Sequence, residues 1–111
     1  MDLEKRIEQL EFQMELLFGN SKTERFIYES GLTRAEYKAL MDLMDRYREK
    51  IDSKETISHS EFENEVYRLI PKIKGDYHFC ELSTQLFAED GRWTEVFTTL
   101  YGSMTKYGGT D

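Results

Sequence analysis

The chain begins with the stretch Met1–Phe18, MDLEKRIEQLEFQMELLF, and the interpretation of everything after it depends on this stretch. Most of the positions between its regularly spaced apolar residues hold Glu, Lys, Arg or Gln. The apolar residues recur at alternating spacings of four and three, the pattern of a heptad seam: Leu3, Ile7, Leu10, Met14 and Leu17. We call these five residues the seam. A helix with such a narrow apolar stripe packs on another helix, and the pattern favours a copy of itself.

The charges beside the seam suit self-association. Arg6 and Glu11 occupy positions that face each other across a parallel pair of heptad helices. Two and a half heptads are marginal in isolation, so we expect other contacts to reinforce the seam. The alternative is that the stripe packs on the chain's own domain.

Length and composition predict one all-α domain. A chain of 111 residues has the size of a single domain, and its 39% apolar content argues against disorder. One proline and seven glycines, mostly between periodic runs, favour helices over a turn-rich β fold. We divide residues 1–111 into an oligomerisation helix at 1–18, a helical bundle at 21–107 and a frayed tail at 108–111, with five or six helices in all.

Repeated capping signals mark where the helices of the bundle begin. A serine or threonine stands three residues before a glutamate at three places, and Leu32 and Ile57 precede the second and third as hydrophobic staples. Pro71 ends one helix and Asp76 caps the next. The three predicted capping pairs are Ser21 with Glu24, Thr33 with Glu36, and Ser58 with Glu61.

Aromatic residues near the C-terminal end could form a second interaction surface. Apolar residues recur at helical spacing through the last predicted helix, and others lie just after Asp76. Such residues either build the core or line a groove for a partner helix. The residues of this possible partner groove are Tyr77, Phe79, Trp93, Phe97 and Tyr101.

Charge and cysteine content constrain location and partners. The formal net charge of −7 disfavours nucleic acid and anionic membranes. The charged N-terminus does not resemble a signal peptide, and a single cysteine excludes an intramolecular disulfide. We therefore predict a cytoplasmic protein with no membrane association.

A helix-turn-helix DNA reader is the main alternative function. The segment Glu24–Leu43 reads as helix, glycine turn, helix, and Arg34 and Lys38 share a face of the second helix. One turn later that face carries Asp42 and Asp45, which would repel phosphates. The charge pattern of this helix therefore disfavours nucleic-acid binding.

Catalytic and metal-binding patterns are weak. Lys50–Phe62 resembles the second half of an EF-hand loop, but Lys50, Lys54 and Glu55 stand where carboxylates and glycine are required. His78 and Cys80 are two residues apart, which points them in different directions on a helix. No metal-ligand pattern or phosphate loop is present in the sequence, so we predict no cofactor and no metal, and an enzyme with an unrecognised site ranks third.

The order of these motifs resembles the YhaI-like family, small helical proteins of low-GC Gram-positive bacteria that are grouped as a domain of unknown function. The resemblance rests on the following segments: Arg6–Glu11, the Gly31-Leu32 turn, the capped Ile57–Phe62 start, Asp76–His78 and Glu95-Val96-Phe97. It implies a multihelical subunit intertwined with its copies as a trimer, with no activity or ligand to carry over. The seam side chains themselves, with β-branched Ile7 alternating with leucines, favour two strands. The leading hypothesis is a non-enzymatic protein that self-associates and acts through protein contacts.

Overall fold

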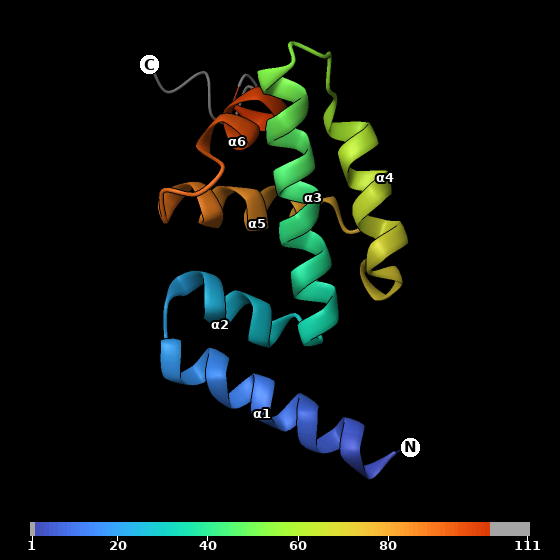
Figure 1. Ribbon diagram of the computed structural model, residues 1–111, viewed down its shortest axis with the longest axis vertical. Helices are drawn as coiled ribbons and strands as arrows, with labels where there is room; N and C mark the ends of the chain where they lie inside the picture. Colours follow the sequence, from blue (N-terminus) through green and yellow to red (C-terminus); the bar gives the residue numbers. More distant parts are fainter. Residues whose placement is uncertain (1, 103–111) are drawn as a thin grey trace.

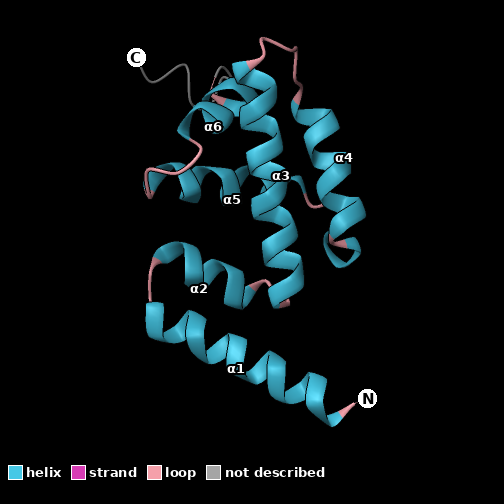
Figure 2. Cartoon of the chain, viewed as in Figure 1, coloured by secondary structure: helices cyan, strands magenta, loops and turns pink. Residues whose placement is uncertain are grey.

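The computed structural model describes residues 2–102 and contains helices joined by turns, with no strand in that range. Figure 2 shows helices and loops alone over this part of the chain. The all-α class and the predicted number of helices are therefore confirmed. The elements are α1 (Leu3–Gly19), α2 (Lys22–Glu29), α3 (Arg34–Asp52), α4 (His59–Leu69), the 3-10 turn η1 (Pro71–Ile73), α5 (Tyr77–Glu89) and α6 (Thr94–Tyr101). The predicted end of the bundle at residue 107 and the tail at 108–111 lie outside the described residues.

The helices begin at the predicted caps. The Ser21 hydroxyl accepts the Glu24 amide at 3.0 Å, and the Glu24 carboxylate accepts the Ser21 amide at 3.3 Å. Thr33 and Glu36 form the same reciprocal pair at 3.1 and 2.9 Å. Ser58 and Asp76 cap α4 and α5 by accepting the amides three residues on, but among the described residues Glu61 makes no return bond to Ser58, so the third predicted pair forms only in part. Local side-chain chemistry therefore sets these four boundaries.

The core lies among helices α2 to α6. Figure 1 shows α4 beside the long helix α3, and α5 and α6 packed across α3 from another side. Aromatic rings fill much of the core. The rings of Tyr47 and Phe62, for example, make an edge-to-face contact with their centroids 5.2 Å apart. The largest fully buried side chains are Tyr47, Tyr101, Phe62, Phe87, Ile27, Leu32, Leu40, Leu43, Met44, Ile70, Val66 and Val96.

Helix α5 is buried on more sides than a simple stripe predicts. Leu82 fits the spacing of the apolar stripe of α5, but 40% of Leu82 is exposed while Ser83 and Thr84 are buried. The physical reason is that α5 contacts α2, α4 and α6, which together cover most of its circumference. The two buried hydroxyls are satisfied within the helix, because both donate to the Cys80 carbonyl.

Helix α1 lies across one end of the molecule, beyond α2 (Figure 1). It ends where predicted, because Asn20 adopts a left-handed conformation with φ of 55° and its amide bonds back to the Leu16 carbonyl. Phe12 and Leu16 are 4% and 3% exposed and join α1 to the core cluster. The molecule measures 48 × 26 × 25 Å, and its longest dimension runs from α1 to α6.

Candidate functional site

The candidate site is the seam of α1, which is exposed in the folded chain. The exposed fractions are 67% for Leu3, 48% for Ile7, 59% for Leu10, 55% for Met14 and 50% for Leu17. The alternative that the stripe packs on its own domain is therefore wrong. Six of the nine large hydrophobic side chains exposed between residues 2 and 102 are on α1, these five and Phe18 at 82%. Contiguous exposed apolar surface of this kind marks an interaction site.

A different face of α1 attaches the helix to the part of the molecule formed by α2 to α6, which we call the body. Phe12 and Leu16 lie about 180° and about 140° around the helix from the centre of the seam, at 100° per residue. Gln9 strengthens this attachment, because its side-chain amide donates to the Leu32 carbonyl at 3.0 Å. Sequence reasoning missed this second face, since two apolar residues among glutamates and glutamines form no regular stripe. The consequence is that the body positions α1 while leaving the seam uncovered.

Charged side chains flank the seam on both sides. Glu4, Arg6 and Glu11 are all exposed. Within residues 2–102, the ion pairs of the chain involve other residues. The hydrogen bond to Glu15 raises the pKa of Arg34, and the negative charge of Glu11 adds to this effect. Arg6 and Glu11 are thus placed for contacts outside the chain.

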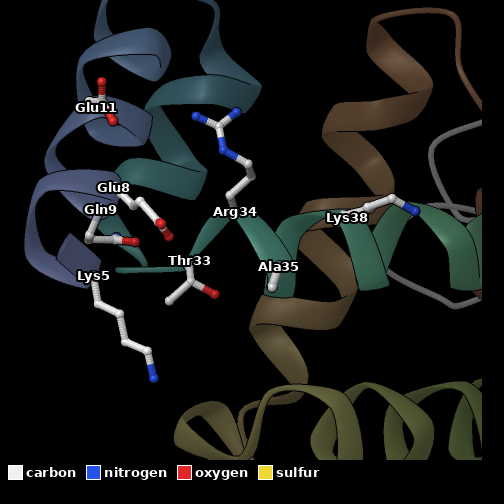
Figure 3. A pocket seen from close by; sticks show the side chains of 8 residues that line it. All are labelled: Lys5, Glu8, Gln9, Glu11, Thr33, Arg34, Ala35 and Lys38. Atoms are coloured by element: carbon white, nitrogen blue, oxygen red, sulfur yellow. The ribbon is translucent and has the colours of Figure 1, made fainter. Parts of the chain in front are cut away.

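An open groove of about 760 Å³ lies between α1 and the start of α3 (Figure 3). Glu8 and Gln9 face α3 in this view, whereas Lys5 and Lys38 extend in different directions from the groove. Its lining carries charges of both signs, which matches neither a phosphate site nor a metal site. The lining residues are Lys5, Glu8, Gln9, Glu11, Thr33, Arg34, Ala35 and Lys38.

Arg34 and Lys38, the two cations that a helix-turn-helix reader would use, form ion pairs within the chain. Both terminal nitrogens of Arg34 donate to the Glu15 carboxylate, at 2.8 and 2.5 Å, and its guanidinium lies 5.1 Å from the centre of the Phe12 ring. The hydrogen bond from Arg34 holds the pKa of the Glu15 carboxyl below its usual value. Lys38 pairs with Asp42 at 3.0 Å. Contact with DNA would have to compete with these pairs.

The five aromatic residues of the possible partner groove do not lie on one open surface. Phe79 and Tyr101 are 4% and 1% exposed, so both are core residues. Trp93 and Phe97 are partly buried and pack against the core. The Tyr101 hydroxyl donates to Glu63 at 2.8 Å, and the Trp93 indole donates to Asp45 at 2.9 Å. Of the five, Tyr77 alone is widely exposed, at 49%.

Cys80 is a buried thiol rather than a nucleophile. It is fully buried on α5, whereas His78 is exposed. Burial raises the pKa of Cys80 to about 12, with a further contribution from the negative charge of Glu63. A thiol with this pKa stays protonated near neutral pH and does not attack substrates. Among the described residues, no group of three or more His, Cys, Asp or Glu side chains is placed to hold a metal ion.

The chain matches no protein-family model, no curated protein and no solved structure. The resemblance to the YhaI-like family stays a prediction from the order of the motifs. Over residues 2–102, none of the helices combines enough length with enough hydrophobicity to cross a bilayer.

Proposed function

We propose that this chain is a non-enzymatic, cytoplasmic protein that self-associates through the seam of α1 and acts through protein contacts. The observation that supports this proposal is the exposure of the seam, at 48–67% for each of its five side chains. Burying such side chains against another helix releases roughly 25 cal/mol for each Å² of apolar surface removed from water. A second copy offers a matching stripe.

The body makes α1 ready for this contact. Isolated helices of this length are marginal in water, but α1 is capped at both ends and anchored by Phe12 and Leu16. The ordering of the helix is therefore complete before association, which lowers the entropic cost of binding. A helix of two and a half heptads is marginally stable in isolation, and its attachment to the body offsets that low stability.

The number of copies is open between two and three. The resemblance to the YhaI-like family implies an intertwined trimer, whereas Ile7 alternating with Leu3 and Leu10 favours two strands. The proposal requires self-association and holds for either number.

The test is to replace one seam residue by a carboxylate. I7D would bury an unpaired charge in the assembly, which costs several kcal/mol, while the folded single chain already exposes this position. We therefore expect I7D to lower the mass in light scattering to that of one chain. Its helical circular dichroism and unfolding midpoint, compared with those of the unaltered chain at concentrations where both are monomeric, should change little.

K5Q is the matched control. Lys5 lies on the same helix off the seam, and this substitution changes the net charge by the same single unit as I7D. K5Q should keep the mass of the unaltered chain. If I7D also kept that mass and its stability, the seam would not be the assembly surface and the proposal would be rejected.

A further inference from the structure

We infer that the copies associate with their α1 helices parallel, so that Arg6 of one copy meets Glu11 of the next. This inference rests on the self-association proposed above and adds the orientation of the partner. The evidence for it is the placement of charges beside the exposed seam of α1, together with the attachment of the opposite side of α1 to the body.

The first step is the register of the charges. The seam places Ile7 and Met14 at one core position of the heptad and its three leucines at the other. Arg6 then directly precedes a core position and Glu11 directly follows one. In parallel heptad helices these two flanking positions, five residues apart, face each other between chains. Each Arg6 thus reaches a Glu11 of the other copy, and a dimer gains two such contacts.

The second step is the cost of the opposite orientation. In an antiparallel pair, each flanking position faces its own kind on the other chain. Glu11 would lie opposite Glu4 of the second copy, and Arg6 would lie beside Gln13. Like charges placed together oppose association, whereas the parallel arrangement pairs unlike charges. The charge pattern therefore favours the parallel orientation.

The third step is the availability of these groups in the folded chain. Arg6 and Glu11 are exposed, and in the described part of the chain neither side chain belongs to an ion pair. Parallel copies also bring Phe18, which is 82% exposed, beside Gln13 of the other chain. The stem of a glutamine can cover part of an aromatic ring, so the parallel pair shields the most exposed apolar side chain on α1.

The fourth step is the position of the body. Phe12 and Leu16 attach α1 to the rest of the chain on the side away from the seam. Two parallel copies that share a seam therefore carry their bodies on opposite sides of the common axis. The bodies do not need to move for the helices to meet.

A cysteine at the first seam position tests the orientation. In a parallel assembly the two Leu3 positions are neighbours, within the Cα separation of 4.4–6.8 Å typical of disulfides. In an antiparallel pair Leu3 faces Met14 of the other chain, and the two Leu3 positions lie about 16 Å apart along the axis. We expect L3C to form a covalent dimer on mild oxidation, detected by non-reducing electrophoresis.

Two controls accompany L3C. The unaltered chain should stay unlinked because its one cysteine, Cys80, is fully buried. E8C places a thiol on an exposed position of α1 off the seam and should also stay unlinked at the same concentration. Linking of E8C at the same rate as L3C would show random collision and overturn the inference.

The outcomes separate this inference from the proposed function. If light scattering shows an assembly while L3C stays unlinked, the parallel orientation is wrong and self-association stands. Linking in a mixture of L3C with M14C would then identify the antiparallel pair. If the unaltered chain is a monomer at every concentration, both the orientation and the proposed function are wrong.

Exchange of charges provides an independent measurement. In the parallel arrangement R6E and E11R should each weaken association severalfold, and the double variant R6E/E11R should restore it, because the unlike pairs return with their signs reversed. An equimolar mixture of the two single variants should also associate more tightly than either alone. In an antiparallel pair E11R would instead strengthen association, since it removes a contact between two glutamates, and that result would overturn the inference.

Discussion

Cys80 shows how burial governs the chemistry of a residue. Its thiol has no exposed surface, and desolvation raises its pKa from 9.0 to about 12. The unfolded chain therefore loses this proton near pH 9, while the folded chain keeps it until pH approaches 12. Where the unfolded state binds fewer protons, stability falls as pH rises. The contribution of Cys80 is complete below pH 9 and is lost between pH 9 and pH 12.

A pH comparison of the C80A variant tests this account. We expect the unaltered chain to have a lower free energy of unfolding, measured in urea, above pH 9 than at pH 8. The fall should be smaller in C80A, where no thiol titrates. Tyr67, whose pKa is raised to about 12 by burial, contributes to the decline in both proteins. An equal decline in both proteins would show that the folded thiol titrates normally.

Some residue-level features could be predicted and others could not. Cys80 is a small core residue, as the composition around it indicates, because a lone cysteine beside apolar positions is usually buried. The hydrogen bonds of Tyr101 to Glu63 and of Trp93 to Asp45 join residues 38 and 48 positions apart. No local pattern encodes such pairs. Trp93 adopts a left-handed conformation with φ of 52°, which its residue type does not suggest.

At the scale of the element, α1 carries two apolar faces with different roles. The face of Phe12 and Leu16 holds the helix to the body, and the seam is exposed. F12A should therefore lower the free energy of unfolding by about 3–5 kcal/mol, the usual cost of removing a buried phenylalanine side chain. Urea denaturation of the monomer measures this loss.

I7A on the same helix is the comparison for F12A. Because Ile7 is 48% exposed, its truncation should change the stability of the single chain by about 0.5 kcal/mol or less. Similar losses in F12A and I7A would contradict the division of α1 into an attached face and an exposed face.

The boundaries of the elements were more predictable than their faces. The caps at Ser21, Thr33, Ser58 and Asp76 lie where the sequence indicates, because capping depends on residues only three positions apart. The face that a helix buries depends on what covers it. Leu82 is exposed although it fits the apolar stripe of α5, and the seam fits a core stripe equally well but is exposed in the part of the chain that the structure describes.

At the scale of the whole molecule, net charge opposes assembly and the seam favours it. Each copy carries a formal charge of −7, so copies repel one another in the absence of salt. At physiological ionic strength the Debye length is about 8 Å, which screens most of this repulsion between exposed groups. We expect burial of the seam to outweigh the remaining repulsion under these conditions. Assembly should therefore be measured at physiological salt.

The most direct test of the central claim is the solution mass of the unaltered chain, measured by light scattering over a dilution series. One chain has a mass of 13.2 kDa. We predict a mass of two or three times this value at high concentration, which falls towards one chain only on strong dilution. A mass of one chain at every concentration would contradict self-association and would leave the exposed seam without the partner proposed for it.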